Sequence, residues 1–212
     1  MIHLSEDNAG IPFYHSREII SRYRLDEIIP EYIRTVLDFN KYVNIVSRET
    51  TPVNLVRLAA DCLIPFDILG RPEGRFFDIG SGGGLPGLIL LLTHPHLEAV
   101  LIERTGKKAT FLRDAIKHFD LKARVIEKDF IEAAGQMDPG SFPLGTMKLV
   151  RLDLKILGRA ISLLKPSGNF IYYADFDSAA IKIPPGFRAG SHRYYLDDNK
   201  QLRTFTIFSA EA

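Results

Sequence analysis

The stretch FFDIGSGGGLPG, residues 76–87, decides the fold class, because an apolar run leads into a cluster of glycines and then into a helical pattern. Glycine admits positive φ and lets a ligand approach the main chain closely. The N-terminus of the following helix offers unpaired N–H groups to a polar or anionic group. The stretch therefore predicts a strand, a ligand-binding loop and a helix. A tight turn without a ligand is the alternative, but such a turn needs fewer glycines.

Downstream of this loop, β-prone runs alternate with helical runs. The β-prone runs are 75–79, 99–102, 124–126, 147–152 and 169–173, and the helical patterns are 86–93, 106–119 and 154–164. Such alternation predicts βαβ units and a parallel sheet. Two further β-rich runs, 191–196 and 202–209, flank the turn-like residues 197–200 and predict a closing hairpin. We therefore expect an α/β fold with a mostly parallel, seven-stranded sheet that ends in an antiparallel hairpin.

Upstream of the loop, apolar residues fall at helical spacing over residues 16–66 and predict about three helices. Pro30 and the pair Thr51-Pro52 carry the signals of helix starts. Residues 1–15 show little pattern and are expected to form a loose tail. The chain is thus predicted to divide into a helical extension, 1–70, and a ligand-binding domain, 71–212.

Composition sets further bounds on function. The chain has 212 residues, of which 46% are apolar and 25% charged, and its net charge is +1. This is typical of a globular protein, and it gives no whole-chain argument for binding nucleic acid or membrane. A single cysteine, Cys62, argues against a disulfide framework and a cysteine-based zinc site, and the six histidines show no metal-ligand spacing. We therefore expect no metal site. No apolar run approaches the length of about 20 residues that a membrane span needs, so we also expect no membrane association and a cytoplasmic location.

Two acidic residues suggest which cofactor the loop binds. Glu103, about 20 residues beyond Gly82 at the end of the second predicted strand, can accept hydrogen bonds from both hydroxyls of a ribose. Asp78 ends the first strand, where it would repel a pyrophosphate and attract the ammonium group of S-adenosylmethionine. The glycine spacing also fits a dinucleotide, but a closing hairpin does not, so S-adenosylmethionine is favoured over NAD. The alternatives are that Asp78 caps backbone N–H groups and that Glu103 pairs with Lys107 or Lys108.

Three segments carry a resemblance to a known family: DIGSGGGLPG at 78–87, IERTGKKATFL at 102–112 and FNKYVNI at 39–45. Together they resemble the RsmG/GidB family of small-subunit ribosomal RNA methyltransferases, over roughly residues 30–170. The resemblance implies a class I methyltransferase core with an N-terminal helical region. It also implies methyl transfer from S-adenosylmethionine to N7 of a guanine in 16S ribosomal RNA. The expected partner is this RNA or the small ribosomal subunit, and we expect a monomer.

The resemblance also assigns site residues. Cofactor contacts carry over to Gly80, Gly82, Gly84 and Leu85, in addition to Asp78 and Glu103. Asp129 and Phe130 follow the third predicted strand, where this fold usually holds the adenine, and Ile131 and Glu132 are the alternatives in a shifted register. Arg151 follows the fourth strand. Arg151 is the candidate catalytic residue, in contact with cofactor or target nucleotide. An ion pair between Arg151 and Asp153 or another acid at the rim is the alternative.

Substrate-side positions depart from the family pattern. Where the family has Ser-Arg-Ala after the fourth strand, this chain has Val-Arg-Leu at 150–152. Where the family has Lys-Gly after the fifth strand, this chain has Tyr-Ala-Asp at 173–175. A methyltransferase fold that acts on another substrate, or that has lost catalysis, is therefore kept as an alternative, as is an NAD-dependent oxidoreductase. Residues 103–128 contain eight Lys or Arg against four acids, which fits either a phosphate-binding surface or a solvated helix face.

Overall fold

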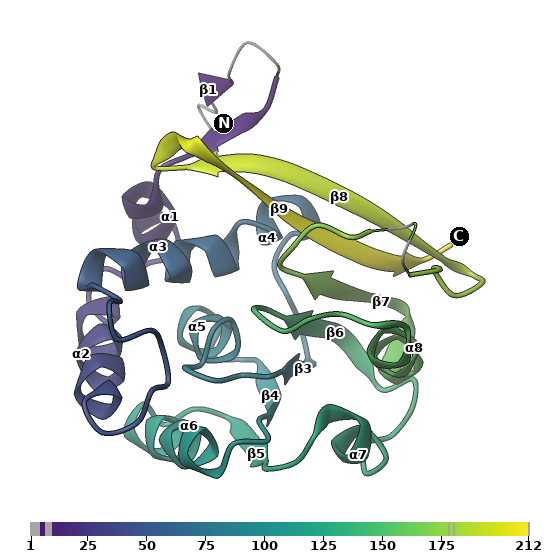
Figure 1. Ribbon diagram of the computed structural model, residues 1–212, viewed down its shortest axis with the longest axis horizontal. Helices are drawn as coiled ribbons and strands as arrows, with labels where there is room; N and C mark the ends of the chain where they lie inside the picture. The colour runs from purple at the N-terminus through teal and green to yellow at the C-terminus, as the bar shows by residue number, and fades with distance from the viewer. Residues whose placement is uncertain (1–4, 7–9, 178, 180, 212) are drawn as a thin grey trace.

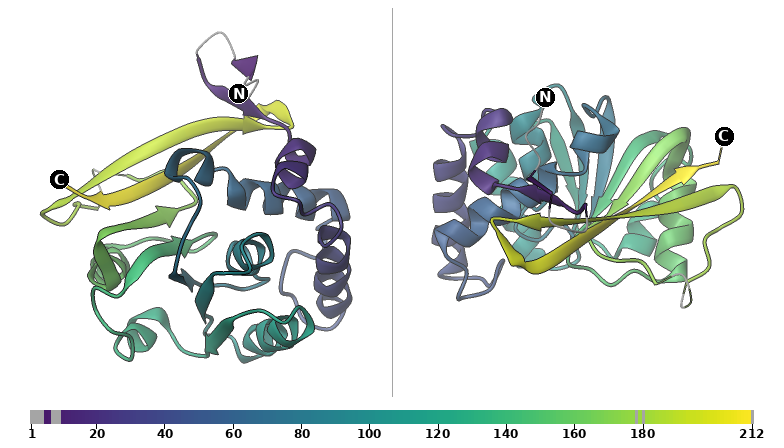
Figure 2. Two further views of the ribbon diagram at one scale, coloured as in Figure 1. Left: turned by 180° about the vertical axis from the view of Figure 1, so that it is seen from behind. Right: turned by 90° about the horizontal axis from the view of Figure 1, so that it is seen from above.

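The computed structural model describes residues 5–6, 10–177, 179 and 181–211. Within these residues, nine strands form one sheet in the order β1-β2-β8-β9-β7-β6-β3-β4-β5, with helices on both of its faces (Figures 1 and 2). The α/β class with a mostly parallel core and N-terminal helices is confirmed.

The centre of the sheet is parallel. Its strands are β3 (Arg75–Ile79), β4 (Glu98–Ile102), β5 (Ala123–Ile126), β6 (Phe142–Met147) and β7 (Leu164–Tyr172). Strand β3 pairs with β4 on one side and β6 on the other, so the strand order reverses at β3. In open α/β sheets, ligands bind at such a reversal, outside the carboxyl ends of the strands. The carboxyl end of β3 runs directly into the glycine loop.

Helices cover both faces of this centre. One face packs against α1 (Ser16–Arg22), α2 (Ile29–Asn40), α3 (Pro52–Leu63), α4 (Phe66–Leu69), α5 (Gly87–Thr93) and α6 (Gly106–His118). The other face packs against α7 (Phe130–Ala134) and α8 (Leu154–Leu163). Alternation along β3 sends Phe76 and Asp78 to the first face and Phe77 and Ile79 to the second. Each fully buried Phe or Leu contributes about 1.5–3 kcal/mol of stabilisation.

The N-terminal helices begin where their start signals predict. The Thr51 hydroxyl accepts a hydrogen bond from the Asn54 N–H, and Pro52 occupies the first turn of α3. Pro30 likewise lies in the first turn of α2. The apolar stripe that was predicted to run to Phe66 is divided between α3 and α4. Because these helices share one hydrophobic core with the sheet, the division of the chain at residue 70 stays a prediction.

The predicted closing hairpin is confirmed. Strands β8 (Phe187–Leu196) and β9 (Asp198–Ala210) are antiparallel, and β9 adds antiparallel to β7 (Figure 1). The turn is tighter than the four residues expected, because Asp198 already belongs to β9. Its central residue, Asp197, has a φ of 63° and accepts hydrogen bonds from Ser16 N and Arg57 Nε. The hairpin turn is therefore joined to α1 and α3.

Two strand predictions are wrong. Strands β1 (Ser5–Glu6) and β2 (Pro12–Tyr14) come from the predicted loose tail, and β2 pairs in parallel with β8, so the sheet is wider than seven strands. Residues 1–4 and 7–9 of that tail lie outside the described residues.

The fourth parallel strand was predicted at 147–152, but β6 ends at Met147. Pro143 and Gly145 weaken the β-pattern of the true strand. Gly145 is nevertheless required there, since a Cβ atom at this position would lie 2.2 Å from the Phe77 ring.

No helix among the described residues is long and apolar enough to cross a bilayer.

Candidate active site

The glycine loop is held in place by main-chain hydrogen bonds. Gly80 N and Ser81 N both donate to the carbonyl of Ile102, at 2.8 and 3.1 Å, and so attach the loop to the end of β4. The Ser81 hydroxyl donates to the Asp78 carbonyl at 3.0 Å, and Gly84 N donates to the Ser81 carbonyl. The loop is therefore a fixed cradle at the reversal of strand order.

Glycine is required at two positions of this cradle. Gly80 has a φ of +69°, and a Cβ atom there would lie 2.4 Å from Val150 Cγ2. Gly84 has a φ of +84°, and its Cβ would lie 2.3 Å from Leu88 Cδ1. Both the backbone conformation and the neighbouring side chains exclude a larger residue. The main chain of the loop thus stays bare, as a site for a closely bound ligand requires.

Glu103 lies against the loop, and its contact with a ribose stays a prediction. Its side chain is buried, with 6% of the residue exposed, and its carboxylate accepts hydrogen bonds from Gly82 N at 3.0 Å and Thr105 N at 2.8 Å. In the described part of the chain, neither Lys107 nor Lys108 bonds to it. A carboxylate has about four acceptor positions, so Glu103 keeps acceptor capacity for the hydroxyls of a ribose.

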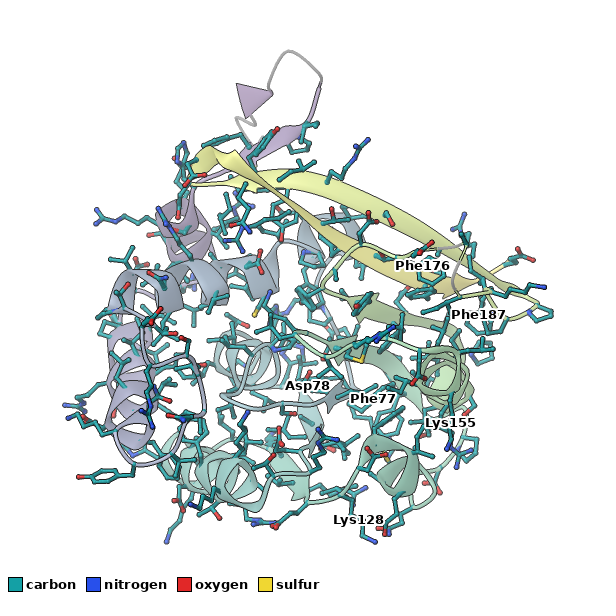
Figure 3. All side chains as sticks on the ribbon, in the orientation of Figure 1. Phe77, Asp78, Lys128, Lys155, Phe176 and Phe187 are labelled. Carbon is teal, nitrogen blue, oxygen red and sulfur yellow. The ribbon has the colours of Figure 1, made fainter. Side chains whose placement is uncertain are left out.

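Asp78 is fully buried in the middle of the molecule (Figure 3), and both of its carboxylate oxygens accept hydrogen bonds within the protein. Thr146 Oγ1 donates to one oxygen at 2.8 Å, and Gly87 N donates to the other at 3.2 Å. Burial raises the pKa of this carboxyl to about 7, although the hydrogen bond from Thr146 opposes that shift. The capping alternative therefore describes the side chain seen here, and its contact with a ligand's ammonium group stays a prediction.

The remaining predicted cofactor contacts follow β5 and the glycine loop. Asp129 caps α7 by accepting a hydrogen bond from Ile131 N at 2.9 Å. Phe130 is buried and packs against Phe77, with ring centroids 6.2 Å apart, so its ring belongs to the core. Leu85 is buried as well. At residues 129–130, the main chain and the Asp129 carboxylate are thus the groups that a cofactor could meet.

Arg151 follows the fourth parallel strand, although at a distance, and its catalytic role stays a prediction. Because β6 ends at Met147, Arg151 is separated from the strand by residues 148–150, and its side chain is exposed. Within the described residues it has no hydrogen bond or ion pair. Asp153, its alternative partner, instead caps α8 by accepting from Ile156 N at 2.7 Å. The position that directly follows the strand belongs to Lys148.

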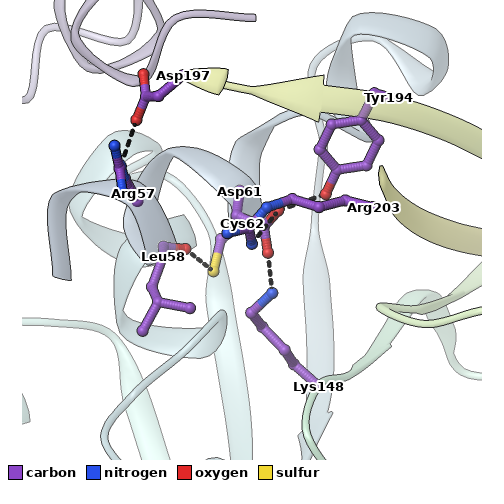
Figure 4. Close-up of polar contacts among 8 residues, drawn as sticks. All are labelled: Arg57, Leu58, Asp61, Cys62, Lys148, Tyr194, Asp197 and Arg203. Carbon is purple, nitrogen blue, oxygen red and sulfur yellow. Dashed lines mark hydrogen bonds and ion pairs between the residues drawn. The ribbon is translucent and has the colours of Figure 1, made fainter. Parts of the chain in front are cut away.

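Lys148 takes part in a buried cluster that sequence reasoning missed, and which we call the Asp61 network (Figure 4). Asp61, on α3, accepts hydrogen bonds from Lys148 Nζ and the Tyr194 hydroxyl and lies 3.3 Å from Arg203 NH1. Lys148 is 5% exposed, and its Nζ lies 4.7 Å from the centroid of the Tyr173 ring. A signal was present, because an acid within an apolar helix stripe requires a buried partner.

The Asp61 network holds its carboxylate ionised. Burial raises the pKa of Asp61, but the charges of Lys148 and Arg203 outweigh that effect, and the pKa is lowered from its usual value. The network joins α3, the residue after β6 and both strands of the hairpin. The network therefore holds the carboxyl end of β6, which lies next to the glycine loop, against α3 and the hairpin.

The N-terminal helical region also covers the glycine loop. Asn40 Oδ1 accepts hydrogen bonds from Ile45 N at 2.9 Å and Val46 N at 3.1 Å, which closes residues 41–46 into a loop. Val46 packs against Gly83, and the Tyr32 hydroxyl donates to the Gly83 carbonyl at 2.8 Å. The conformation of residues 41–46 is thus coupled to that of the glycine loop.

Among the described residues, no cluster of His, Cys, Asp or Glu is placed to hold a metal ion.

Comparison with solved structures agrees with this geometry. The fold matches the cofactor-bound Rv0187 from MTB with a TM-score of 0.62 and 16% identity, over 85% of this chain and 89% of that one. It matches the O-methyltransferase from Bacillus cereus with a TM-score of 0.59 and 15% identity, over 85% and 91% of the two chains. At such identities the likeness concerns the fold. The fold, with the glycine loop at its switch point, is that of the class I methyltransferases.

Sequence comparison identifies the family. The family model GidB, described as rRNA small subunit methyltransferase G, matches residues 26–174. Ribosomal RNA small subunit methyltransferase G of Paracoccus denitrificans is 31% identical over 146 residues, which are 69% of this chain and 74% of that protein. The protein of that name from Xanthomonas axonopodis pv. citri is 29% identical over 164 residues, 75% and 74% of the two chains. This chain belongs to the rRNA small subunit methyltransferase G family, whose cofactor is S-adenosylmethionine, and the NAD alternative is set aside.

Proposed function

We propose that this protein transfers the methyl group of S-adenosylmethionine to N7 of a guanine in small-subunit ribosomal RNA. The observation that carries the proposal is the hydrogen bond between Glu103 and Gly82 N, which joins an acceptor carboxylate to a bare glycine loop at the switch point of the sheet. The family match over residues 26–174 supports the RNA as substrate.

The chain's own residues account for cofactor binding. We assign the ribose hydroxyls to Glu103, and the main chain of the loop, at Gly80, Gly82 and Gly84, to the amino-acid portion. Leu85 and the segment 129–130 are assigned to the remaining contacts, with the adenine at the latter. Asp78 lies beneath the loop and supports it, since its carboxylate accepts a hydrogen bond from Gly87 N at the start of α5. Bound S-adenosylmethionine supplies the electrophilic methyl group.

The target atom explains the chemistry that the site requires. Guanine N7 carries a lone pair and no proton, so its methylation needs no general base. Rate acceleration can then arise from holding the acceptor nitrogen in line with the methyl–sulfur bond, and well-oriented reactants gain several kcal/mol in this way. The glycine cradle, fixed by Ile102, Tyr32 and Val46, is suited to that task.

Arg151 is assigned to the target nucleotide. Its exposed guanidinium lies on the chain that follows β6 and carries no ion pair within the described residues, so it is available to a phosphate or a base. Val150, next to it, lies over Gly80 and ties this segment to the cofactor loop. Arg151 would therefore affect turnover and leave the affinity for the cofactor unchanged.

A single assay with labelled cofactor tests the proposal. The protein is incubated with 16S ribosomal RNA, free and in the small subunit, and the labelled nucleotide is mapped. We expect label at N7 of one guanine in the wild-type protein. In Glu103→Gln, calorimetric titration should show about 10- to 100-fold weaker cofactor binding, because a hydrogen bond to a charged acceptor contributes about 1.5–3 kcal/mol. In Arg151→Ala, cofactor binding should persist and labelling should fall.

Two outcomes would contradict the assignments. Cofactor binding by the wild-type protein without label in any ribosomal RNA would favour a non-catalytic methyltransferase fold, which the altered residues at 150–152 otherwise support. Unchanged cofactor affinity in Glu103→Gln would remove this residue from the site. The proposal includes a monomer that acts in the cytoplasm, where its RNA substrate is made, and size-exclusion chromatography at micromolar concentration tests the oligomeric state.

A further inference from the structure

A surface depression of about 760 Å³ lies between residues 40–48 and the start of α6. The described residues that line it include three cations, Lys41, Arg48 and Lys107, and no carboxylate. Lys41 already pairs with Asp38 at 2.7 Å, whereas neither Arg48 nor Lys107 has an ion pair in the part of the chain that the structure describes. The depression therefore carries a positive charge that the protein itself does not neutralise.

Tyr42 lies in the same lining and is 86% exposed. A large aromatic side chain that is exposed to this degree adds nothing to the core, although its backbone is well fixed. Asn40 binds the far end of the 41–46 loop, and Asn44 Oδ1 accepts a hydrogen bond from Arg48 Nε at 3.0 Å, which orients the guanidinium. The surface thus presents one aromatic ring and an oriented guanidinium on a backbone that the Asn40 side chain holds by two hydrogen bonds.

We propose that this Tyr42 surface, formed by Tyr42, Arg48 and Lys107, binds a single-stranded segment of the RNA substrate. Single strands are bound by cations that follow the phosphates and by exposed aromatic rings on which bases stack. Arg48 and Lys107 contact phosphates, and Tyr42 stacks on an unpaired base. This inference rests on the proposed function, since it names where the RNA is held next to the methyl-transfer site.

Position favours RNA at this depression over a second depression in the described part of the chain. Residues 41–46 contact the glycine loop through Val46 and Gly83, so a strand bound there passes beside the cofactor. The other depression, of about 230 Å³, lies at the opposite edge of the sheet, where β3, β4 and β5 begin, and includes the carboxylate of Glu98. Only the first combines proximity to the cofactor loop with an unopposed positive charge.

The test compares RNA affinity and cofactor affinity in matched variants. Tyr42→Ala should weaken the binding of 16S ribosomal RNA by about 5- to 150-fold, because base stacking on an aromatic ring contributes about 1–3 kcal/mol. Tyr42→Phe keeps the ring and should bind as the wild-type protein does. Arg48→Ala should reduce the salt dependence of RNA binding by about one phosphate contact. Affinity for S-adenosylmethionine should be unchanged in Tyr42→Ala and Arg48→Ala.

A matched control comes from the same helix as Lys107. Lys117 is exposed on the last turn of α6, about 15 Å along the axis from Lys107. Lys117→Ala should therefore bind RNA like the wild-type protein, while Lys107→Ala should bind it more weakly.

Three results would overturn the proposal. Wild-type RNA affinity in a Tyr42→Ala/Arg48→Ala double variant would exclude the surface while leaving the proposed function intact. If the double variant binds free RNA as the wild-type protein does but binds the small subunit more weakly, the surface contacts a ribosomal protein and not RNA. Failure of the wild-type protein itself to bind or methylate the RNA would reject the proposed function together with this inference.

Discussion

Asp61 and Asp78 are both buried on the same face of the sheet, yet they are held in opposite electrostatic states. Asp61 faces two cations, Lys148 and Arg203, and its pKa is lowered. Asp78 faces neutral donors, the Thr146 hydroxyl and Gly87 N, and burial raises its pKa to about 7. The comparison shows that burial disfavours the charged form in both cases, and that the charge of the partners decides which form prevails.

The two carboxylates also connect different parts of the molecule. Asp61 joins segments that are far apart in sequence, from α3 to the hairpin strand β9 (Figure 4). Among the described residues, the partners of Asp78 are closer together: Thr146 on the neighbouring strand β6, and Ser81 and Gly87 in the loop and helix that follow β3. Loss of Asp61 should therefore affect the whole fold, whereas changes at Asp78 should act mainly on the region under the cofactor loop.

The largest expected effect comes from Asp61→Asn. This change leaves the ammonium group of Lys148 buried without an opposite charge, and breaking a buried ion pair from one side costs about 3–5 kcal/mol. Urea denaturation at pH 7, followed by circular dichroism, measures the loss in the free energy of unfolding.

Two further variants decide whether the loss comes from the unpaired charge. Lys148→Met in the Asp61→Asn background removes that charge and should restore part of the stability. Asp38→Asn, which affects only the exposed pair with Lys41, should leave the unfolding midpoint unchanged. An Asp61→Asn variant as stable as the wild-type protein would show that these contacts do not contribute to the stability of the fold.

A smaller effect, dependent on pH, is expected for Asp78→Asn. An aspartate in the unfolded chain loses its proton near pH 3.9, while the folded protein keeps this proton to about pH 7. Between these values the folded state binds more protons, so the stability of the wild-type protein falls as pH rises, by up to about 1.4 kcal/mol per unit. The variant lacks this contribution, and its stability relative to the wild-type protein should increase by about 2 kcal/mol from pH 5 to pH 7.

The two aspartates should then have opposite effects on the pH dependence of the free energy of unfolding. The lowered pKa of Asp61 provides stability above the unfolded pKa that is lost as pH falls through the folded value, so the deficit of Asp61→Asn should shrink in acid. Denaturation curves between pH 2 and pH 8 for the wild-type protein and both variants test this, because the contribution of Asp61 is lost only below the unfolded pKa of about 3.9. Parallel pH profiles for the wild-type protein and Asp78→Asn would show that Asp78 is not held protonated in the fold.

The sequence predicted the parts that local patterns govern. The glycine loop, the acid at Glu103 and the capped start at Thr51 each combine residue types whose backbone preference or chemistry is distinctive, and each lies where expected. Strand β6 was misplaced because its β-propensity is weak and its stability comes from pairing with β3 and β7. The catalytic candidate Arg151, which comes from the family resemblance, therefore follows β6 after three intervening residues and not directly.

The tertiary contacts could not be predicted in the same way. Asp61, Lys148, Tyr194 and Arg203 are separated by up to 142 positions and share no local motif, so only the folded chain shows that they meet. The same reasoning applies to β2, which is three residues long and exists because β8 offers it an edge. The orientation of Asp78 also depends on a distant partner, Thr146, and the sequence left both of its roles open.

The smallest expected effect concerns Tyr173, which lies against the Asp61 network. Its ring faces Lys148 Nζ, and its hydroxyl donates to the Cys62 carbonyl at 2.6 Å, in the last turn of α3. Tyr173→Phe keeps the ring next to the cation and removes one hydrogen bond to a carbonyl near a helix end, so the free energy of unfolding should fall by about 1 kcal/mol. Tyr173→Leu also removes the cation–π contact and should lose more. Equal losses in the two variants would show that the ring gives Lys148 no support, and that the carboxylate of Asp61 alone stabilises this buried charge.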